Sequence, residues 1–453
     1  MNTFPKGFML GAATAAHQVE GNNIHSDYWV QEQLPHSSFD EPSLDAVDHY
    51  HRYAEDIGLL ASAGLNTYRF SIEWARIQPE PDAWVEDEVE HYRKVLQCCY
   101  DHHVKPIVTM MHFSSPKWLI SMGGWENPQV VELFAAYCER LVGELGDMME
   151  YVCTINEANM RLQLAALIQD MMKRMVGGAA AENADAVGAE DTGAAGESGD
   201  AVQSGGASAS DVQVGVNLMM ENMKLSMMEN ARAFGIEDSA GVHTFVSQCT
   251  PQGDLLVMRA HEAARDAMKA QCPHLKIGLT LSLHDLQPYP GGEVMARKEW
   301  DEEFLHYLPA IENDDFLGVQ CYTRKRFDEN GVTQPTDGEP RTQMGYEDYP
   351  AAIAGVVRNV AEAFKGELIV TENGIATDDD GRRCEFIREA AAGLMDCIAE
   401  GIPLKGYMYW SLLDNFEWQK GYSKTFGLIA VDRTTQKRYP KESLKVLGAL
   451  AGK

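Results

Sequence analysis

The chain has 453 residues, which allows one large barrel with insertions or roughly three smaller domains. Apolar residues make up 45% and charged residues 23%, and this balance excludes a disordered chain or a small disulfide-stapled scaffold. The 68 acidic residues outnumber the 38 basic ones, and the resulting net charge of −30 disfavours nucleic acid and anionic lipid as partners.

The cysteines and the N-terminus indicate the compartment. The nine cysteines are an odd number without a CxxC pair, so we expect free thiols in a reducing compartment. No basic segment followed by an apolar one opens the chain, and no apolar run reaches the ~18 residues of a membrane helix. We therefore expect a cytoplasmic protein with no membrane contact. The sequence carries no signal for an oligomeric state.

Eight short apolar runs recur along the chain, with turn-forming residues around them. They cover residues 8–13, 67–72, 106–110, 151–155, 277–283, 316–319, 368–370 and 406–410. Short apolar runs of this kind are typical of parallel strands that are buried on both faces.

Amphipathic helical patterns separate the runs. They cover residues 49–63, 89–102, 128–145, 255–271, 352–364 and 386–399. Strands that alternate with helices predict an α/β fold, a single (β/α)8 TIM barrel over residues 1–453. A doubly wound open sheet is the structural alternative, but no glycine-rich phosphate-binding turn follows the first run.

One segment departs from this alternation. Residues 176–216 are rich in Ala, Gly, Ser and acidic residues and contain no Lys or Arg, which predicts a flexible insertion after the fourth strand. Met-rich helical patterns at 160–175 and 218–228 flank it. Because βα loops line the active-site face of a barrel, the insertion is either a substrate-gating lid or a solvated linker.

Two carboxylates follow predicted strands. Glu157 comes directly after the fourth run, and Glu372 comes after the seventh. A carboxyl group in such a place is costly to bury without a partner. Two of them at one barrel mouth suit retaining glycoside hydrolysis, which needs a nucleophile and a proton donor about 5–5.5 Å apart. Spacing alone is equally compatible with structural ion pairs.

The residues around these carboxylates form longer motifs. Thr154-Ile155-Asn156-Glu157 and Thr371-Glu372-Asn373-Gly374 resemble the two catalytic signatures of glycoside hydrolase family 1, the β-glucosidase family. Residues 8–21, 68–77 and 409–428 resemble the first, second and eighth strands of that family with their loops. The resemblance runs nearly end to end, and only about residues 161–255 lack a counterpart.

The resemblance implies a role for each matching residue. Glu372 is the nucleophile and Glu157 the acid/base; Arg69 keeps Glu372 ionised, Tyr322 hydrogen-bonds it, and Asn156 binds the sugar 2-hydroxyl. The implied sugar-binding residues are Gln18, His112, Glu417 and Trp418, with Trp410 as a flat face beneath the ring. Without the resemblance, His112 and Trp410 would be interpreted as structural. No metal or cofactor is implied.

Several positions differ from the family pattern. Ala158 stands where the family usually has Pro, Phe113-Ser114-Ser115-Pro116 replaces Trp-Asp-Leu-Pro, and Gln320 replaces an Asn close to the nucleophile. In the phosphate site of the 6-phospho-glycosidases, Lys424 matches, but Glu417 replaces Ser and Phe426 replaces Tyr. A carboxylate repels a phosphate dianion at close range, which favours unphosphorylated sugars.

These observations predict a retaining β-glycosidase that hydrolyses unphosphorylated β-linked glucosides, galactosides or fucosides through a covalent glycosyl-enzyme. The expected partner is a small-molecule glycoside or a short oligosaccharide. A transglycosidase of the same family and a catalytically silent sugar-binding barrel are the alternatives.

Overall fold

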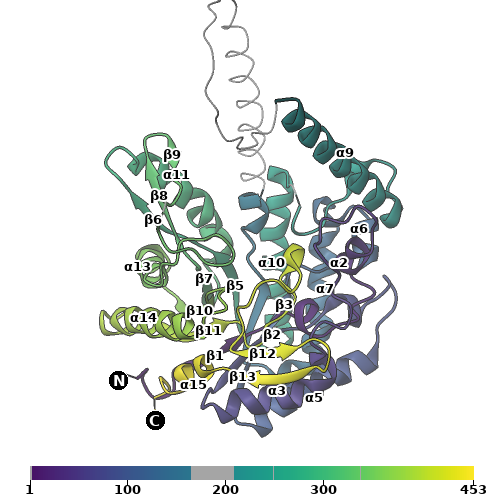
Figure 1. The fold of residues 1–453 in the computed structure, drawn as a ribbon. Helices are drawn as coiled ribbons and strands as arrows, with labels where there is room; N and C mark the ends of the chain where they lie inside the picture. The colour runs from purple at the N-terminus through teal and green to yellow at the C-terminus, as the bar shows by residue number, and fades with distance from the viewer. Residues whose placement is uncertain (1–2, 165–208, 248, 337, 453) are drawn as a thin grey trace, which may run out of the picture.

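Eight parallel strands close into a barrel in the computed structural model, which describes residues 3–164, 209–247, 249–336 and 338–452 (Figure 1). In barrel order the strands are β1 (Met9–Ala13), β11 (Leu404–Trp410), β10 (Glu367–Asn373), β7 (Phe316–Gln320), β5 (Lys276–Ser282), β4 (Tyr151–Ile155), β3 (Lys105–Met111) and β2 (Thr67–Ser71). Every predicted run is one of these strands, and the predicted TIM barrel is confirmed.

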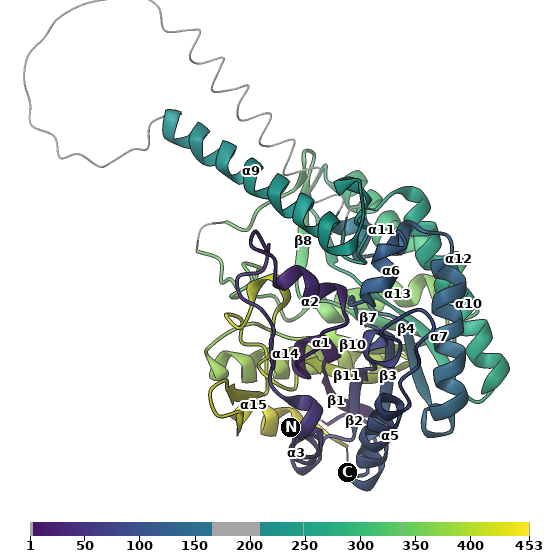
Figure 2. The same cartoon turned by 90° about the vertical axis from the view of Figure 1, so that its right-hand side faces the viewer.

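Helices cover the outside of the barrel, as Figures 1 and 2 show. The six predicted patterns correspond to α3 (His49–Ser62), α5 (Glu86–Asp101), α7 (Val130–Leu145), α10 (Pro251–Gln271), α13 (Ala352–Ala363) and α14 (Asp380–Ala399). The helices α5, α10 and α14 begin before their apolar patterns, and a polar residue caps the start of α10 and of α14. Thr250 accepts a hydrogen bond from Gly253 N, and Asp379 accepts one from Gly381 N.

Shorter elements fill the connections. The helices are α1 (Ala16–Val19), α2 (Asp27–Glu32), α4 (Trp74–Ile77), α6 (Lys117–Ser121), α11 (Glu293–Glu303), α12 (Leu308–Ile311) and α15 (Glu442–Gly448). The 3-10 turns in the described part of the chain are Gly124–Glu126, Gly146–Met148, Ser239–Gly241, Leu305–Tyr307 and Trp418–Lys420. Two small sheets lie outside the barrel: β6 (Asp285–Pro288) with β8 (Arg324–Asp328) and β9 (Gly331–Val332), and β12 (Ile429–Asp432) with β13 (Lys437–Pro440).

Strand β8 carries three consecutive cations, Arg324, Lys325 and Arg326. Each is ion-paired with a carboxylate: Glu347, Glu303 and Glu339, respectively. The longest basic run of the chain is therefore neutralised within its own neighbourhood and forms no basic patch.

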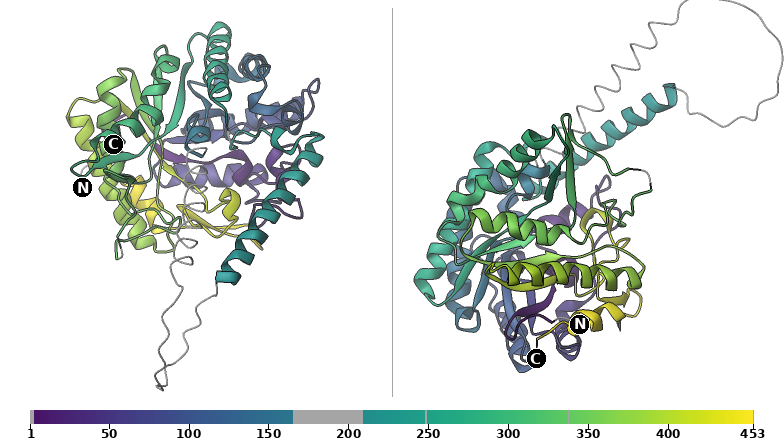
Figure 3. Two further views of the ribbon diagram at one scale, coloured as in Figure 1. Left: turned by 90° about the horizontal axis from the view of Figure 1, so that it is seen from above. Right: turned by 90° about the vertical axis from the view of Figure 1, so that its left-hand side faces the viewer.

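The long helix α9 (Ala209–Phe234) follows the part of the chain that was expected to be an insertion, and its N-terminal half projects beyond the barrel (Figures 2 and 3). Residues 209–216, which the composition predicts to be part of the flexible insertion, are helical instead. The helix begins before the Met-rich pattern at 218–228. The predicted insertion at 176–208 and the Met-rich stretch from residue 165 onward lie outside the described residues.

The two ends of the chain meet beneath the barrel (Figure 1), where Phe4 N donates a hydrogen bond to Leu450 O at 2.9 Å. One large apolar cluster packs the outer faces of the strands against the helices. A second apolar cluster includes Met9, Ile107 and Phe316 from three different strands. Among the described residues, no helix is long and apolar enough to cross a membrane.

Candidate active site

Glu372, near the end of β10, is buried and accepts three hydrogen bonds. Arg69 Nη1 lies 2.6 Å and Gln320 Nε2 3.1 Å from its Oε1, and the Tyr322 hydroxyl lies 2.7 Å from its Oε2. Burial raises the pKa of Glu372, while Arg69, Tyr322 and Gln320 act in the opposite direction. The three donors favour the ionised carboxylate that a nucleophile requires.

Glu157 follows β4 and lies in a different environment. Its backbone N donates to Thr280 Oγ1 at 2.9 Å, which fixes the turn after the strand. Burial, and then the charge of Glu372, raise the pKa of Glu157 well above its usual range. Because Glu372 has the cation and the donors, a single proton shared by the pair resides on Glu157.

Asn156 determines which nitrogen of His112 carries a proton. Its Oδ1 accepts from Arg69 Nη2 at 2.6 Å, and a guanidinium can only donate, so Nδ2 must be the atom that faces His112. Nδ2 donates to His112 Nε2 at 3.1 Å. Burial and the nearby Arg69 lower the pKa of His112 well below its usual range, so the ring is neutral and its proton lies on Nδ1.

Several buried polar atoms around this centre lack a partner among the described residues: Gln18 Oε1, His112 Nδ1 and Gln320 Oε1. Gln18 is held by its other amide atom, since Nε2 donates to Phe416 O at 2.7 Å. A buried polar atom without a hydrogen-bond partner costs free energy. One donor, His112 Nδ1, and two acceptors, Gln18 Oε1 and Gln320 Oε1, at one site therefore indicate a ligand with hydroxyl groups. Burial, followed by the charge of Glu372, raises the pKa of Glu417 to about 8.

Aromatic rings form one wall of the site. His112 lies against Trp410, with ring centroids 5.7 Å apart, and against Trp418 at 6.1 Å. His17 lies nearly parallel to Trp418 at 5.9 Å, and its Nε2 is 2.7 Å from Glu32 Oε1. Flat apolar faces beside polar groups suit a sugar ring, which has C–H faces and a hydroxylated edge.

Three residues of the site have a left-handed backbone although none is glycine. Their φ values are 45° at Glu157, 69° at Phe113 and 48° at Trp418. Such conformations cost about 1–3 kcal/mol each, and in native proteins they cluster at functional sites. Here they turn the chain at the ends of β4 and β3 and in the loop after β11.

A cavity of about 550 Å³ opens above these groups. All the predicted site residues line it except Arg69 and Gln18, which lie behind it and hydrogen-bond Glu372 and Glu417. Sequence reasoning missed further lining residues, among them Met160, His284, Lys325, Met344 and Tyr346. They belong to no motif, and the one signal available was that His284 comes directly after a predicted strand, the run at 277–283.

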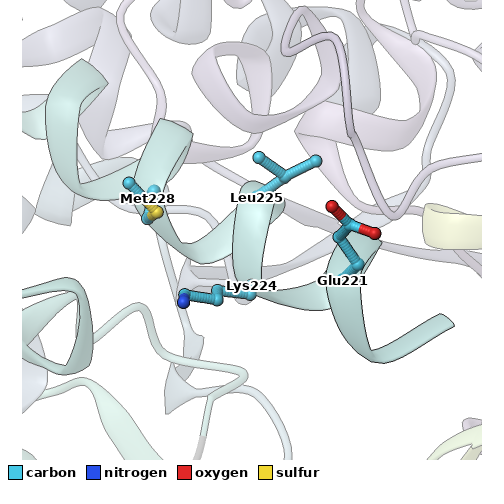
Figure 4. A pocket seen from close by; sticks show the side chains of 4 residues that line it. All are labelled: Glu221, Lys224, Leu225 and Met228. Carbon is cyan, nitrogen blue, oxygen red and sulfur yellow. The ribbon is translucent and has the colours of Figure 1, made fainter. Parts of the chain in front are cut away.

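A second pocket lies on α9 and is lined by Glu221, Lys224, Leu225 and Met228 (Figure 4). It shares no lining residue with the barrel cavity. Within the described ranges, no group of three or more His, Cys, Asp or Glu side chains could hold a metal ion.

Comparison with known proteins identifies the family. The sequence model of Glycosyl hydrolase family 1 matches residues 1–182 and 305–453. The chain belongs to this family. It is a β-glycosidase of glycosyl hydrolase family 1, and the unmatched residues 183–304 include most of the expected insertion and also β5.

Family members with solved structures resemble it along its whole length. The β-glycosidase BGL167 is 40% identical, with a TM-score of 0.83 and coverage of 99% of this chain and 97% of that one. A Thermotoga maritima β-glucosidase, solved with glucoimidazole, is 25% identical, with a TM-score of 0.75 and coverage of 99% and 98%. A 6-phospho-β-galactosidase of Staphylococcus aureus is 27% identical over 97% of this chain and 96% of its own. Overall similarity to this family therefore does not fix the substrate.

Proposed function

We propose that this family 1 enzyme is a retaining β-glycosidase that hydrolyses unphosphorylated β-linked glucosides, or the corresponding galactosides or fucosides, by double displacement. The observation that carries the proposal is the pair of buried carboxyl groups in one cavity with opposite surroundings. Glu372 has a cation and two further donors, while Glu157 has a pKa that burial and Glu372 raise well above its usual range. One group suits attack on carbon, and the other suits proton donation.

In the first step, Glu372 attacks the anomeric carbon while Glu157 gives its proton to the glycosidic oxygen. The bond to the aglycone breaks as the ester to Glu372 forms. The ester is uncharged, so the repulsion that raised the pKa of Glu157 is gone. Glu157 can then take a proton from water, whose oxygen attacks the same carbon and releases Glu372.

The partnerless polar atoms support a sugar with free hydroxyl groups. His112 Nδ1 offers a proton, and Gln18 Oε1 and the Glu417 carboxyl offer oxygens. A phosphate dianion in this half of the cavity would meet the Glu417 carboxyl and the ionised Glu372, and like charges repel at short range. The relatives include both β-glucosidases and a 6-phospho-β-galactosidase, so similarity alone does not decide between the two substrate classes. The repulsion of a phosphate is the feature that supports unphosphorylated substrates.

The decisive test is the Glu372→Ala variant with an aryl β-glucoside, using Glu385→Ala on the surface of α14 as the matched control. We expect kcat to fall by about 10⁴-fold or more, since no group remains to form the ester. Added azide should restore part of the aryl release and give an α-glycosyl azide. Normal turnover in Glu372→Ala, or a β-glycosyl azide as the product, would contradict the proposal.

A further inference from the structure

The cavity has two halves that come from different arcs of the barrel. The candidate sugar-binding residues Gln18, His112 and Glu417 follow β1, β3 and β11, which belong to the continuous arc β11-β1-β2-β3. Glu157 follows β4, on the arc β4-β5-β7. Because an acid must reach the oxygen of the group that departs, the leaving group faces this second arc.

Among the polar side chains that line the cavity on the second arc, two share an anchor. His284 comes just after β5, and Lys325 lies on β8, just after β7. Both are anchored by Glu303, whose side chain is only 2% exposed. Its Oε1 lies 2.8 Å from His284 Nδ1 and 2.6 Å from Lys325 Nζ. Lys325 Nζ also lies 2.5 Å from Glu299 Oε1.

This anchoring determines what each side chain can offer to a ligand. Burial opposes ionisation of Glu303, but His284 and Lys325 together lower its pKa to about 2. The ionised carboxylate can only accept, so His284 Nδ1 carries a proton, and Nε2 is the ring nitrogen that remains for a ligand. Lys325 has three N–H groups, and two are used by Glu299 and Glu303. Neither the remaining N–H nor Nε2 has a partner among the described residues.

Apolar side chains line the cavity as well. Leu283, Met344 and Met160 line the same cavity, and so does Tyr346, which is 41% exposed. A flat aromatic leaving group would use the apolar surfaces alone. A sugar would use both, because each hydroxyl group can donate or accept a hydrogen bond while the C–H faces of the ring contact the apolar side chains.

We propose that the half of the cavity beside Glu157 is a sugar-binding subsite in which His284 and Lys325 hydrogen-bond adjacent hydroxyl groups of the leaving sugar. The substrate class is then a disaccharide or short β-linked oligosaccharide. The inference rests on the proposed function, since it assumes that Glu157 protonates the leaving group. The two carboxylates that hold Lys325 offset its charge, so the subsite favours a neutral leaving group over an anionic one.

The test compares two substrates with the same sugar on the Glu372 side: the aryl β-glycoside that the enzyme cleaves best, and the matching β-1,4-disaccharide (cellobiose for a glucosidase, lactose for a galactosidase). We expect Lys325→Met to lower the ratio of kcat/KM for the disaccharide to kcat/KM for the aryl glycoside by about tenfold or more, because a hydrogen bond from a charged donor is lost. Lys325→Arg, which keeps a charged donor, should retain most of the ratio.

Two further variants control for a nonspecific effect of losing a lysine and for poor folding of Lys325→Met. Lys298→Met removes an exposed lysine of α11 that pairs with Glu302 outside the cavity, and it should leave the ratio unchanged. Because Lys325→Met leaves Glu303 buried without its cation, the double variant Lys325→Met/Glu303→Gln removes both charges and should show the same loss if the single variant folds poorly.

Each outcome is decisive. A lower ratio in Lys325→Met or in the double variant, with an unchanged ratio in Lys298→Met, supports the subsite. An equal loss on both substrates, or a wild-type enzyme that cleaves aryl glycosides but not the disaccharide, overturns the subsite and leaves the proposed function standing. A wild-type enzyme that cleaves neither substrate overturns the proposed function as well.

Discussion

Gln320, at the end of β7, hydrogen-bonds both the candidate nucleophile Glu372 and Asn156 through one amide nitrogen. Its Nε2 lies 3.1 Å from Glu372 Oε1 and 2.8 Å from Asn156 Oδ1. Its side chain is one methylene longer than the Asn of the family pattern. The structure shows that this side chain reaches Glu372 directly and acts as its third donor, so it stabilises the ionised form of the nucleophile.

Removing this donor should therefore change the pH dependence. In Gln320→Leu we expect kcat/KM to fall by about tenfold, because a hydrogen bond to a charged group is lost. The pKa of Glu372 should rise, and since the nucleophile works only when ionised, the acid limb of the pH profile should move to higher pH. Gln78→Leu, whose amide bonds Trp74 and Pro81 outside the cavity, is the control. An acid limb that stays in place would show that Gln320 does not tune the nucleophile.

At the scale of elements, one buried ion pair fastens the C-terminal hairpin to the barrel. Arg438 of β13 lies 2.7 Å from Asp56 of α3, and both side chains are 0% exposed. Arg438 Nη2 also donates to Val47 O at 2.7 Å, and His49 Nδ1 lies 2.8 Å from the same aspartate. The hairpin therefore depends on charge pairing, since its short strands bury little apolar surface.

Breaking this pair should destabilise the whole protein. Arg438→Met leaves Asp56 buried without its cation, which costs about 3–5 kcal/mol in the free energy of unfolding. Calorimetry should show a clear drop in Tm. Arg433→Met, which removes a half-exposed arginine paired with Asp45, should cost about 1 kcal/mol or less. Similar losses in both variants would mean that Arg438 does not fasten the hairpin.

The elements that the sequence predicted share one property, which is apolar periodicity. The eight barrel strands and six covering helices all have it, and the ends of β4 and β10 then place Glu157 and Glu372. The small sheets β6-β8-β9 and β12-β13 escaped prediction because ion pairs such as Arg438–Asp56 hold them, and such pairs leave no periodic pattern. Lys325 was missed because its place in the cavity depends on a contact with Glu303 that spacing along the chain does not reveal.

At the scale of the whole molecule, the net charge of −30 surrounds a cavity that itself contains the ionised Glu372. Fields of this sign act over a Debye length, which falls from about 30 Å at 0.01 M salt to about 3 Å at 1 M. A neutral glycoside is indifferent to such a field, whereas an anionic one is repelled before it reaches the cavity.

This difference predicts that the kcat/KM values of a neutral and of an anionic substrate respond differently to salt. Across that range, kcat/KM for an aryl β-glucoside should change by less than about twofold. An aryl 6-phospho-β-glucoside should be at least about tenfold poorer at low salt, and its kcat/KM should rise as salt screens the repulsion. Nitrophenol release at a fixed pH measures both. A phosphorylated substrate that is preferred at low salt would contradict the assignment of Glu417 and the role of the overall charge.

The two arcs of the barrel are also separate stretches of the gene. The residues beside the first sugar, Gln18, His112 and Glu417, lie in the first quarter of the chain and close to its C-terminus, whereas those beside the leaving group fall between Met160 and Tyr346. One central block can thus be exchanged between homologues while the flanking blocks stay. Recombination with crossovers after β4 and before α13 would create enzymes that keep their preference for one sugar and acquire a new one for its partner.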